Sequence, residues 1–286
     1  MVTFCLSRLA RLVPVMLGVS LVTFLLLHLV PGDPAEILAG PEATPTQVEE
    51  LRSRLGLGVP LPVQYLGYLA RLLRGDLGTS LRTGRPVARE IAARFPVTLG
   101  LAAGSAAVAA SLGIPLGVAC ALRRDTALDL LGMAVALIGV STPVYWLAML
   151  SLYLFWVRFP LLPAGGGAGP WDLILPSLVL GAGGSGILAR LSDYLRTARA
   201  KGLGERGVVY RHALRNALVP VITVVGLQVG YLLGGAVLTE TVFGLNGLGR
   251  YTVQSISFRD YPAVQGVVVV FAACIVLVNL AVDLAY

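Results

Sequence analysis

Residues 190–220 read RLSDYLRTARAKGLGERGVVYRHALRNALVP and form the most strongly basic stretch of this chain. The stretch holds seven basic residues against two acidic ones, Asp193 and Glu205. Apolar segments flank it on both sides, so we expect a polar loop between two membrane-spanning helices. Such a loop is either a solvated tether or a surface that another protein contacts, and the flanking sequence bears on that choice.

The composition places the chain in a membrane. It has 286 residues, of which 56% are hydrophobic and 13% are charged, and its mean hydropathy is +0.82. Soluble proteins contain about 25% charged residues, and a chain with half that share cannot cover a globular surface with polar side chains. The net charge of +7 resides mostly in short loops, where membrane topology accounts for it, so nucleic acid is not implied.

Six apolar runs are each long enough, at about 20 residues, to cross a bilayer as a helix. We therefore expect an all-α polytopic membrane protein with six transmembrane helices, one of them kinked at Pro143. The expected spans are residues 12–30, 97–122, 130–157, 173–188, 219–239 and 263–286.

The only long polar segment covers residues 33–96 and is expected to be a small helical cap outside the cytoplasm. Thr46 and Glu49 fit a capping box that opens a short helix. Pro62 to Arg74 has the apolar spacing of a second, amphipathic helix.

The orientation follows from the basic residues of the short loops. Loops assigned to the cytoplasm carry eleven of them, and short loops assigned outside carry three. Because basic residues favour the cytoplasmic side, both termini and the loop 190–218 are expected in the cytoplasm.

The sequence contains no catalytic or cofactor motif. A phosphate-binding G-x-x-x-x-G-K-[ST] loop is missing, as are HExxH and GxSxG, and the three cysteines lie far apart. We therefore expect no catalytic residues, no metal and no cofactor bound by this chain. Gln228 and Asn279 are polar candidates for lining a pathway, although either could equally hydrogen-bond two helices. Gly226, Gly230 and Gly234 share one helix face and suit close helix packing.

Several segments resemble those of one family. Within the basic loop they are Arg196 to Leu203 (RTARAKGL) and Tyr210 to Pro220 (YRHALRNALVP). Elsewhere, in collinear order, they are Leu9–Pro14, Val30–Pro34, Leu72–Ser80 (LLRGDLGTS), Arg94–Leu99 (RFPVTL), Glu240–Gly249 (ETVFGLNGLG) and Arg259–Pro262 (RDYP). Together these resemble the permease subunits of binding-protein-dependent ABC importers, in the dipeptide, oligopeptide and nickel branch.

The resemblance implies a type I ABC importer permease fold, a location in a prokaryotic plasma (inner) membrane, and a set of partners. These are a second, similar permease, two ATP-binding-cassette ATPases that bind ATP and Mg, an extracytoplasmic substrate-binding protein, and membrane lipid. It also implies that a coupling helix docks on an ATPase and transmits its motion to the pathway. The corresponding residues are Arg196, Thr197, Ala198, Arg199, Ala200, Lys201, Gly202 and Leu203.

The cargo implied by the resemblance is a di- or oligopeptide, with nickel or another small solute as the alternative. An ATP-independent secondary carrier is the rival transporter class, and an intramembrane enzyme would need paired catalytic groups that the spans lack. The chain departs from the branch in its shorter connection between Arg190 and Arg196. It also ends at Tyr286, before the basic tail that is usual in the branch.

Overall fold

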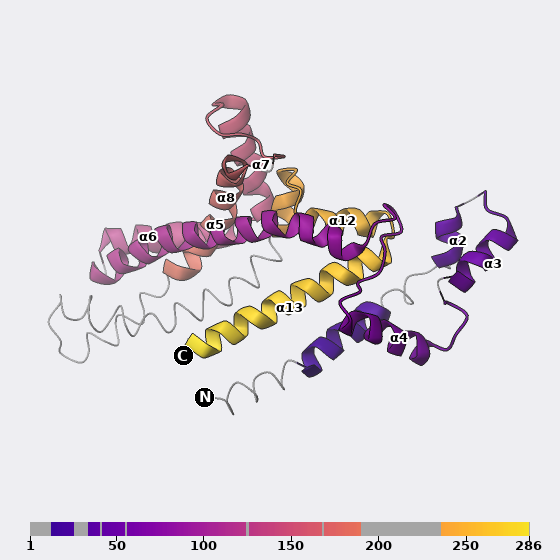
Figure 1. Cartoon of the computed structure of the whole chain (residues 1–286). Coiled ribbons are helices and arrows are strands. Elements are labelled where there is room, and N and C mark those ends of the chain that lie inside the picture. Colours follow the sequence, from indigo (N-terminus) through magenta and orange to yellow (C-terminus); the bar gives the residue numbers. More distant parts are fainter. Residues whose placement is uncertain are drawn as a thin grey trace. The chain divides into compact units, whose positions relative to one another are not determined.

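The computed structural model describes residues 13–25, 34–40, 42–54, 56–123, 126–167, 169–189 and 236–285, which are mostly helical (Figure 1). They divide into two compact units. The first unit draws on Met1–Ala93 and Gln254–Cys274, and the second on Arg94–Val253 and Ile275–Tyr286. Two long helices, α5 (Val87–Leu122) and α13 (Tyr261–Ala285), contribute residues to both units.

In the first unit an apolar helix, Val13–Leu25, packs against α4 (Leu61–Leu73). The ring of Phe24 lies 5.4 Å from that of Tyr65 and 5.9 Å from that of Tyr68, measured between centroids. The helix expected at Pro62 to Arg74 is thereby confirmed as α4. Two proline residues at its start, Pro60 and Pro62, suit the first turn, where backbone N–H groups have no helical partner.

Two shorter helices, α2 (Pro34–Ala39) and α3 (Pro45–Arg54), precede α4. The capping box expected at Thr46 and Glu49 is wrong by two residues. The backbone N–H of Thr44 donates to Gln47 Oε1 at 2.9 Å, and the N–H of Gln47 donates back to Thr44 Oγ1 at 3.4 Å. The box forms at Thr44 because Pro45 is favoured in the first helical position, which moves the cap to the residue before it.

Helix α5 begins at Val87, ten residues before the expected span, and continues through Pro96. Its first turns are held in the first unit, where Val87 and Ile91 are buried. Gly266 of α13 lies directly against them, since a Cβ at this glycine would sit 2.7 Å from Val87 Cγ1. This packing outweighs the single backbone hydrogen bond that Pro96 removes from the helix.

In the second unit, small residues bring α5 and α8 (Ile174–Ala189) into close contact. A Cβ at Gly104 would lie 2.5 Å from Ser177 Oγ, and a Cβ at Gly181 would lie 2.7 Å from the carbonyl oxygen of Ser105. Gly104 and Gly181 therefore allow the close helix approach that is typical of membrane proteins.

The expected span at residues 130–157 is two helices. α6 (Ala127–Ser141) and α7 (Val144–Leu152) are bent by 94° at a break before Pro143, and α7 continues into a π-helix, Tyr153–Arg158. The kink is this sharp because Thr142, the residue before proline, adopts an extended conformation with ψ of 124°.

Two of the described helices are long and apolar enough to cross a membrane, Val87–Cys120 and Tyr261–Leu284, and a third span arises if the bent pair counts as one. Helix α8, preceded by a 3-10 turn at Pro170–Leu173, has 16 residues. The expected span at 219–239 falls almost entirely outside the described residues.

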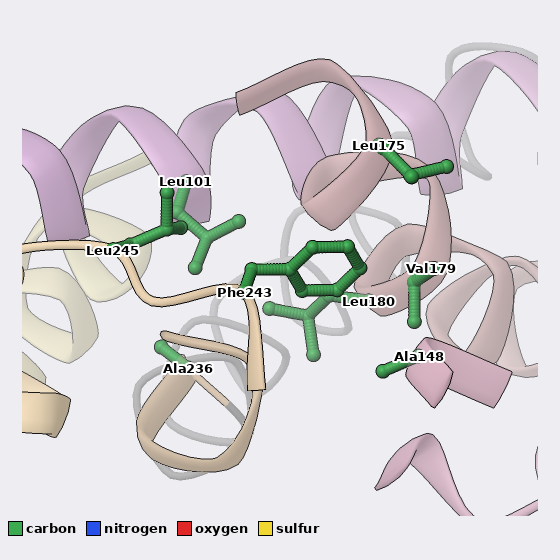
Figure 2. Close-up of a cluster of buried hydrophobic side chains, with 8 residues drawn as sticks. All are labelled: Leu101, Ala148, Leu175, Val179, Leu180, Ala236, Phe243 and Leu245. Carbon is green, nitrogen blue, oxygen red and sulfur yellow. The ribbon is translucent and has the colours of Figure 1, made fainter. Parts of the chain in front are cut away.

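A buried cluster of eight apolar side chains forms the core of the second unit (Figure 2). The ring of Phe243 lies among side chains from α5, α7 and α8, with Leu180 beside it. The remaining members are Leu101, Ala148, Leu175, Val179, Ala236 and Leu245. Phe243 and Leu245 thus anchor the segment that follows residue 240 on three other helices.

Candidate functional site

The segment Glu240–Gly249 contains the end of a helix and a tight reversal. Gly244 has a φ of +67°, and the N–H of Leu245 donates to the carbonyl oxygen of Glu240 at 2.9 Å. The N–H of Gly244 donates to the carbonyl oxygen of Thr241 at 3.4 Å. This is a Schellman helix end, which needs a residue in the left-handed conformation and so explains the glycine.

Glu240 is the centre of a buried hydrogen-bond cluster. Thr98 Oγ1 of α5 donates to Glu240 Oε1 at 2.6 Å, and the N–H of Arg250 donates to Glu240 Oε2 at 3.0 Å. The same Thr98 hydroxyl accepts from the N–H of Leu248 at 2.8 Å. We call Thr98, Glu240, Leu248 and Arg250 the Glu240 cluster. It fastens the segment after residue 240 to α5.

The Glu240 carboxyl group lies in the expected outer loop, beyond the expected span 219–239, and is 0% exposed. Burial raises the pKa of this carboxyl group above its usual 4.5, and hydrogen bonds from Thr98, Arg250 and Gly249 oppose the rise. A Cβ at Gly247 would overlap the carboxyl group, and a Cβ at Gly249 would lie 2.5 Å from Val237 Cα. A larger residue at position 247 would therefore collide with the Glu240 carboxyl group, and one at position 249 with the helix backbone at Val237.

Asp260 is the centre of a second cluster, in the first unit. Ser80 Oγ donates to Asp260 Oδ2 at 2.5 Å, and the N–H of Leu81 donates to Asp260 Oδ1 at 3.0 Å. Asp260 and Ser80 are each 1% exposed. We call Ser80, Leu81 and Asp260 the Asp260 cluster. It joins the turn that precedes α5 to the start of α13.

The chain reverses immediately before Asp260, between α12 (Leu248–Ser257) and α13. Arg259 has a φ of +54°, and the N–H of Asp260 donates to the carbonyl oxygen of Ser255 at 2.8 Å. Asp260 then accepts from the N–H of Ala263 at 3.4 Å, as an N-terminal cap of α13. Helix α12 lies between the expected spans 219–239 and 263–286, where no helix was predicted.

The two clusters are built alike and suit a mechanical role. Each buries one carboxyl group, which accepts a hydrogen bond from a hydroxyl group more than 140 positions away in the chain and another from a backbone N–H group. A buried polar group that is satisfied in this way is costly to separate from its partners. Among the described residues no group of His, Cys, Asp and Glu could hold a metal ion. The clusters fix the connections between helices.

Most of the predicted site residues lie outside the described residues. These are Arg196 to Leu203, Gln228, Gly226, Gly230 and Gly234. Asn279 lies in α13, and its side chain is exposed in the isolated chain. Of the predicted coupling, packing and pathway residues only Asn279 lies in the described part of the chain, so the roles of all of them stay predictions.

The structure assigns contacts to four polar residues for which the sequence predicted no role: Thr98, Glu240, Ser80 and Asp260. Each falls in a segment that carried the family resemblance, but the pairing of those segments was not foreseen. The available signal was an acidic residue next to an apolar run or a proline, with glycines at close spacing, as in Glu240–Gly249. That signal indicates a buried carboxylate but does not identify its partner.

Two family descriptions match this chain. Residues 113–286 match the binding-protein-dependent transport system inner membrane component, and residues 1–102 match the N-terminal part of the membrane component of such systems. Together they cover both clusters and the basic loop.

Relatives with assigned names match over the whole chain. A dipeptide transport system permease, DppB of Alkalihalophilus pseudofirmus, is 41% identical over 324 aligned positions, covering 100% of this chain and 97% of the relative. A glutathione transport system permease, GsiC of Salmonella paratyphi A, is 44% identical over 296 positions with the same coverage. Both alignments are longer than this chain, so each relative carries residues that this chain lacks.

One solved structure shares the fold. It is an inward-facing form of the MetNI methionine ABC transporter, with a TM-score of 0.51 and 19% sequence identity. The match covers 65% of this chain and 89% of the other. The chain therefore belongs to the family of binding-protein-dependent transport system inner membrane components, as a polytopic helical permease subunit of an ABC importer and not as an enzyme.

Proposed function

We propose that this permease carries short peptides, of two or a few residues, into the cell. The observation that supports the cargo is the full-length similarity, at 41% and 44% identity, to permeases named for a dipeptide and for glutathione. Glutathione is itself a tripeptide, so the two names share a chemical class. Neither name points to nickel, and a carrier that works without an ATPase is not favoured by the family.

The proposed assembly pairs this chain with a second, similar permease in the lipid bilayer. Two ATPase subunits bind on the cytoplasmic side, and a substrate-binding protein delivers the peptide from outside. The proposed topology has six spans with both termini in the cytoplasm and residues 33–96 outside. The excess of basic residues in the loops assigned to the cytoplasm supports this orientation.

Residues Arg196 to Leu203 are the proposed contact with an ATPase. Lysine and arginine side chains in this stretch can donate to carboxylates and carbonyl groups of a partner, and Gly202 suits the end of a short helix. The ATPases supply the energy, and closure of the ATPase pair moves this loop and so switches the pathway between its two accessible states.

The pathway and the packing faces are proposed from residue type. Asn279 is exposed on α13 in the isolated chain, which leaves it available to the pathway or to the second permease. Gln228 is proposed to line the same pathway, and Gly226, Gly230 and Gly234 to pack against the second permease.

The cargo is tested with the complete transporter in proteoliposomes. The permease pair, both ATPases and the binding protein are reconstituted, and uptake of a labelled dipeptide, labelled glutathione and Ni²⁺ is measured with and without ATP. We expect ATP-dependent uptake of at least one peptide and none of Ni²⁺. Uptake of Ni²⁺ alone, or peptide uptake without the ATPases, would refute the proposal.

The coupling role is tested by Gly202→Trp, with Gly207→Trp as a matched control in the same loop. If residues 196–203 dock on an ATPase, Gly202→Trp abolishes ATP-driven uptake while the permease stays in the membrane. The second permease still co-purifies, and at most the ATPase that binds at this contact is lost. The control keeps most of its uptake. Near-normal uptake by Gly202→Trp in an intact assembly would contradict the coupling role.

A further inference from the structure

Helix α4 carries two apolar stripes, and only one of them is covered. The covered stripe includes Tyr65 and Tyr68, which pack on helix Val13–Leu25. The other stripe recurs at intervals of three and four residues and is exposed. Its members are Val63 (55% exposed), Leu66 (64%), Ala70 and Leu73 (88%). A helix with apolar residues on both sides has to bury the second side against something.

The covered stripe contacts the apolar body of the first membrane helix. The Ser20 hydroxyl and the Tyr65 hydroxyl are 2.9 Å apart, and the Tyr65 hydroxyl also donates to the carbonyl oxygen of Leu17 at 3.3 Å. Ser20 and Leu17 lie inside the apolar run 12–30, away from its ends. Helix α4 therefore lies beside the hydrophobic part of this helix, and not beyond it.

A second contact joins this region to the start of α13. Gln265 Nε2 of α13 donates to the carbonyl oxygen of Thr23 at 3.2 Å. Gln265 is four residues, or about 6 Å, from the start of α13, which is one of the two described helices able to cross a membrane. Phe24, next to Thr23, is the residue against which α4 packs. Helix α4 thus packs on the same part of helix Val13–Leu25 that contacts the first turns of α13.

The stretch of α4 before Arg71 suits an apolar medium. From Leu61 to Ala70 the helix has no charged side chain, and Gln64 Nε2 is satisfied within the chain by the carbonyl oxygen of Val59, at 2.7 Å. In hydrocarbon an unsatisfied polar group costs several kcal/mol. Charge returns only at Arg71 and Arg74, where long side chains can reach phosphate headgroups.

The neighbouring helix α3 shows the opposite pattern. Its surface carries the exposed ion pair of Arg52 with Glu49, at 2.5 Å, and exposed Gln47.

With 13 residues, or roughly 20 Å, α4 is too short to cross a bilayer, and helices of this length in membrane proteins are often interfacial or re-entrant.

From these contacts we propose that α4 is a membrane-contact helix beside helix Val13–Leu25, with Val63, Leu66, Ala70 and Leu73 against lipid acyl chains. Lipid is the occupant that fits, because helix Val13–Leu25 also exposes apolar side chains, among them Val13, Val15 and Val22. Residues 33–96 therefore include a lipid-embedded part as well as the water-exposed α3.

The test places a fluorophore on α4 in the assembled transporter in lipid nanodiscs. Cys5, Cys120 and Cys274 are first replaced by serine or alanine, and NBD is then attached through Leu66→Cys. Leu277→Cys in α13, whose native side chain is 61% exposed, is the lipid-facing control. Gln47→Cys in α3 is the water-facing control. Quenching by doxyl-labelled phosphatidylcholine and by aqueous iodide is measured for each.

We expect NBD at residue 66 to match the lipid-facing control, with strong quenching by doxyl lipid, weak quenching by iodide and blue-shifted emission. Quenching like that of the water-facing control would overturn the proposal. Protection from both quenchers would also overturn it, because a protein partner would then cover the stripe. This readout does not depend on transport, so it is independent of the proposed cargo.

Discussion

Thr98 provides the sharpest test of the Glu240 cluster, because one hydroxyl group serves as both donor and acceptor. In Thr98→Val the shape of the side chain is nearly kept, but Glu240 Oε1 loses the donor at 2.6 Å and the N–H of Leu248 loses its acceptor at 2.8 Å. Thr98 and Glu240 are both 0% exposed, so water does not readily replace either bond. Two buried groups are then left without their partner.

The expected cost follows from these two bonds. A neutral hydrogen bond contributes about 1 kcal/mol and one to a charged group about 1.5–3 kcal/mol, so Thr98→Val loses about 2–4 kcal/mol. For a chain of this size each kcal/mol lowers Tm by about 2–4 °C. We therefore expect Tm to fall by roughly 4–16 °C in the purified permease.

Thr98→Ser is the matched control, because serine keeps the hydroxyl group and loses only a methyl group. Tm is measured for both variants in one detergent and at one heating rate, since unfolding of such proteins is often irreversible. A double-mutant cycle with Glu240→Gln measures the coupling, for which we expect about 1–3 kcal/mol. Equal Tm values for Thr98→Val and Thr98→Ser, or a coupling energy near zero, would refute the reasoning.

Three further outcomes follow from the same contacts. Gly247→Ala places a Cβ on the Glu240 carboxyl group and is expected to lower the stability measured by thermal unfolding by about 1–3 kcal/mol. The control Gly58→Ala has nothing within 4 Å of its Cβ and should change the stability by no more than about 0.5 kcal/mol. Equal effects of the two variants would contradict the overlap. Asp260→Ala should destabilise the chain by about 3 kcal/mol or more, and Ser80→Ala by less, because Asp260 accepts hydrogen bonds from both Ser80 and a backbone N–H. A larger loss of stability for Ser80→Ala in the same assay would argue against this order. Burial raises the pKa of Glu240, so the folded chain binds the carboxyl proton more tightly than the unfolded chain does. The stability that this proton contributes is complete below pH 4.5 and is lost as pH rises through the folded pKa. Glu240→Gln should flatten that part of a Tm–pH curve, and an unchanged curve would show that another group titrates.

Local apolar patterns predicted three of the helices. The spacing of Tyr65, Leu66, Leu69 and Leu72 predicted α4 almost to the residue, and the apolar runs predicted α8 and α13 within one or two residues of each start. Helix α12 was missed because residues 248–257, LGRYTVQSIS, mix polar and β-branched residues. It is stabilised by burying Leu248, Tyr251 and Ser255 on one face, which only the folded chain makes possible.

The early start of α5 was missed for a related reason. Pro96 and the charged residues before it are typical of a loop that ends at the membrane. The helix nevertheless begins at Val87, since Val87 and Ile91 are buried and Gly266 of α13 lets them approach closely. A partner more than 170 positions away in the chain therefore sets this boundary.

The sequence by itself determined that the chain is a helical membrane protein, that it resembles permeases of ABC importers, and which segments carry that resemblance. Only the tertiary structure decided how four of those segments combine: Thr98 with Glu240, 142 positions apart, and Ser80 with Asp260, 180 positions apart. Apolar periodicity is a local property and can be read from neighbouring residues. The partner of a buried carboxylate depends on which helices pack together and in which register, and short-range sequence patterns do not contain that information.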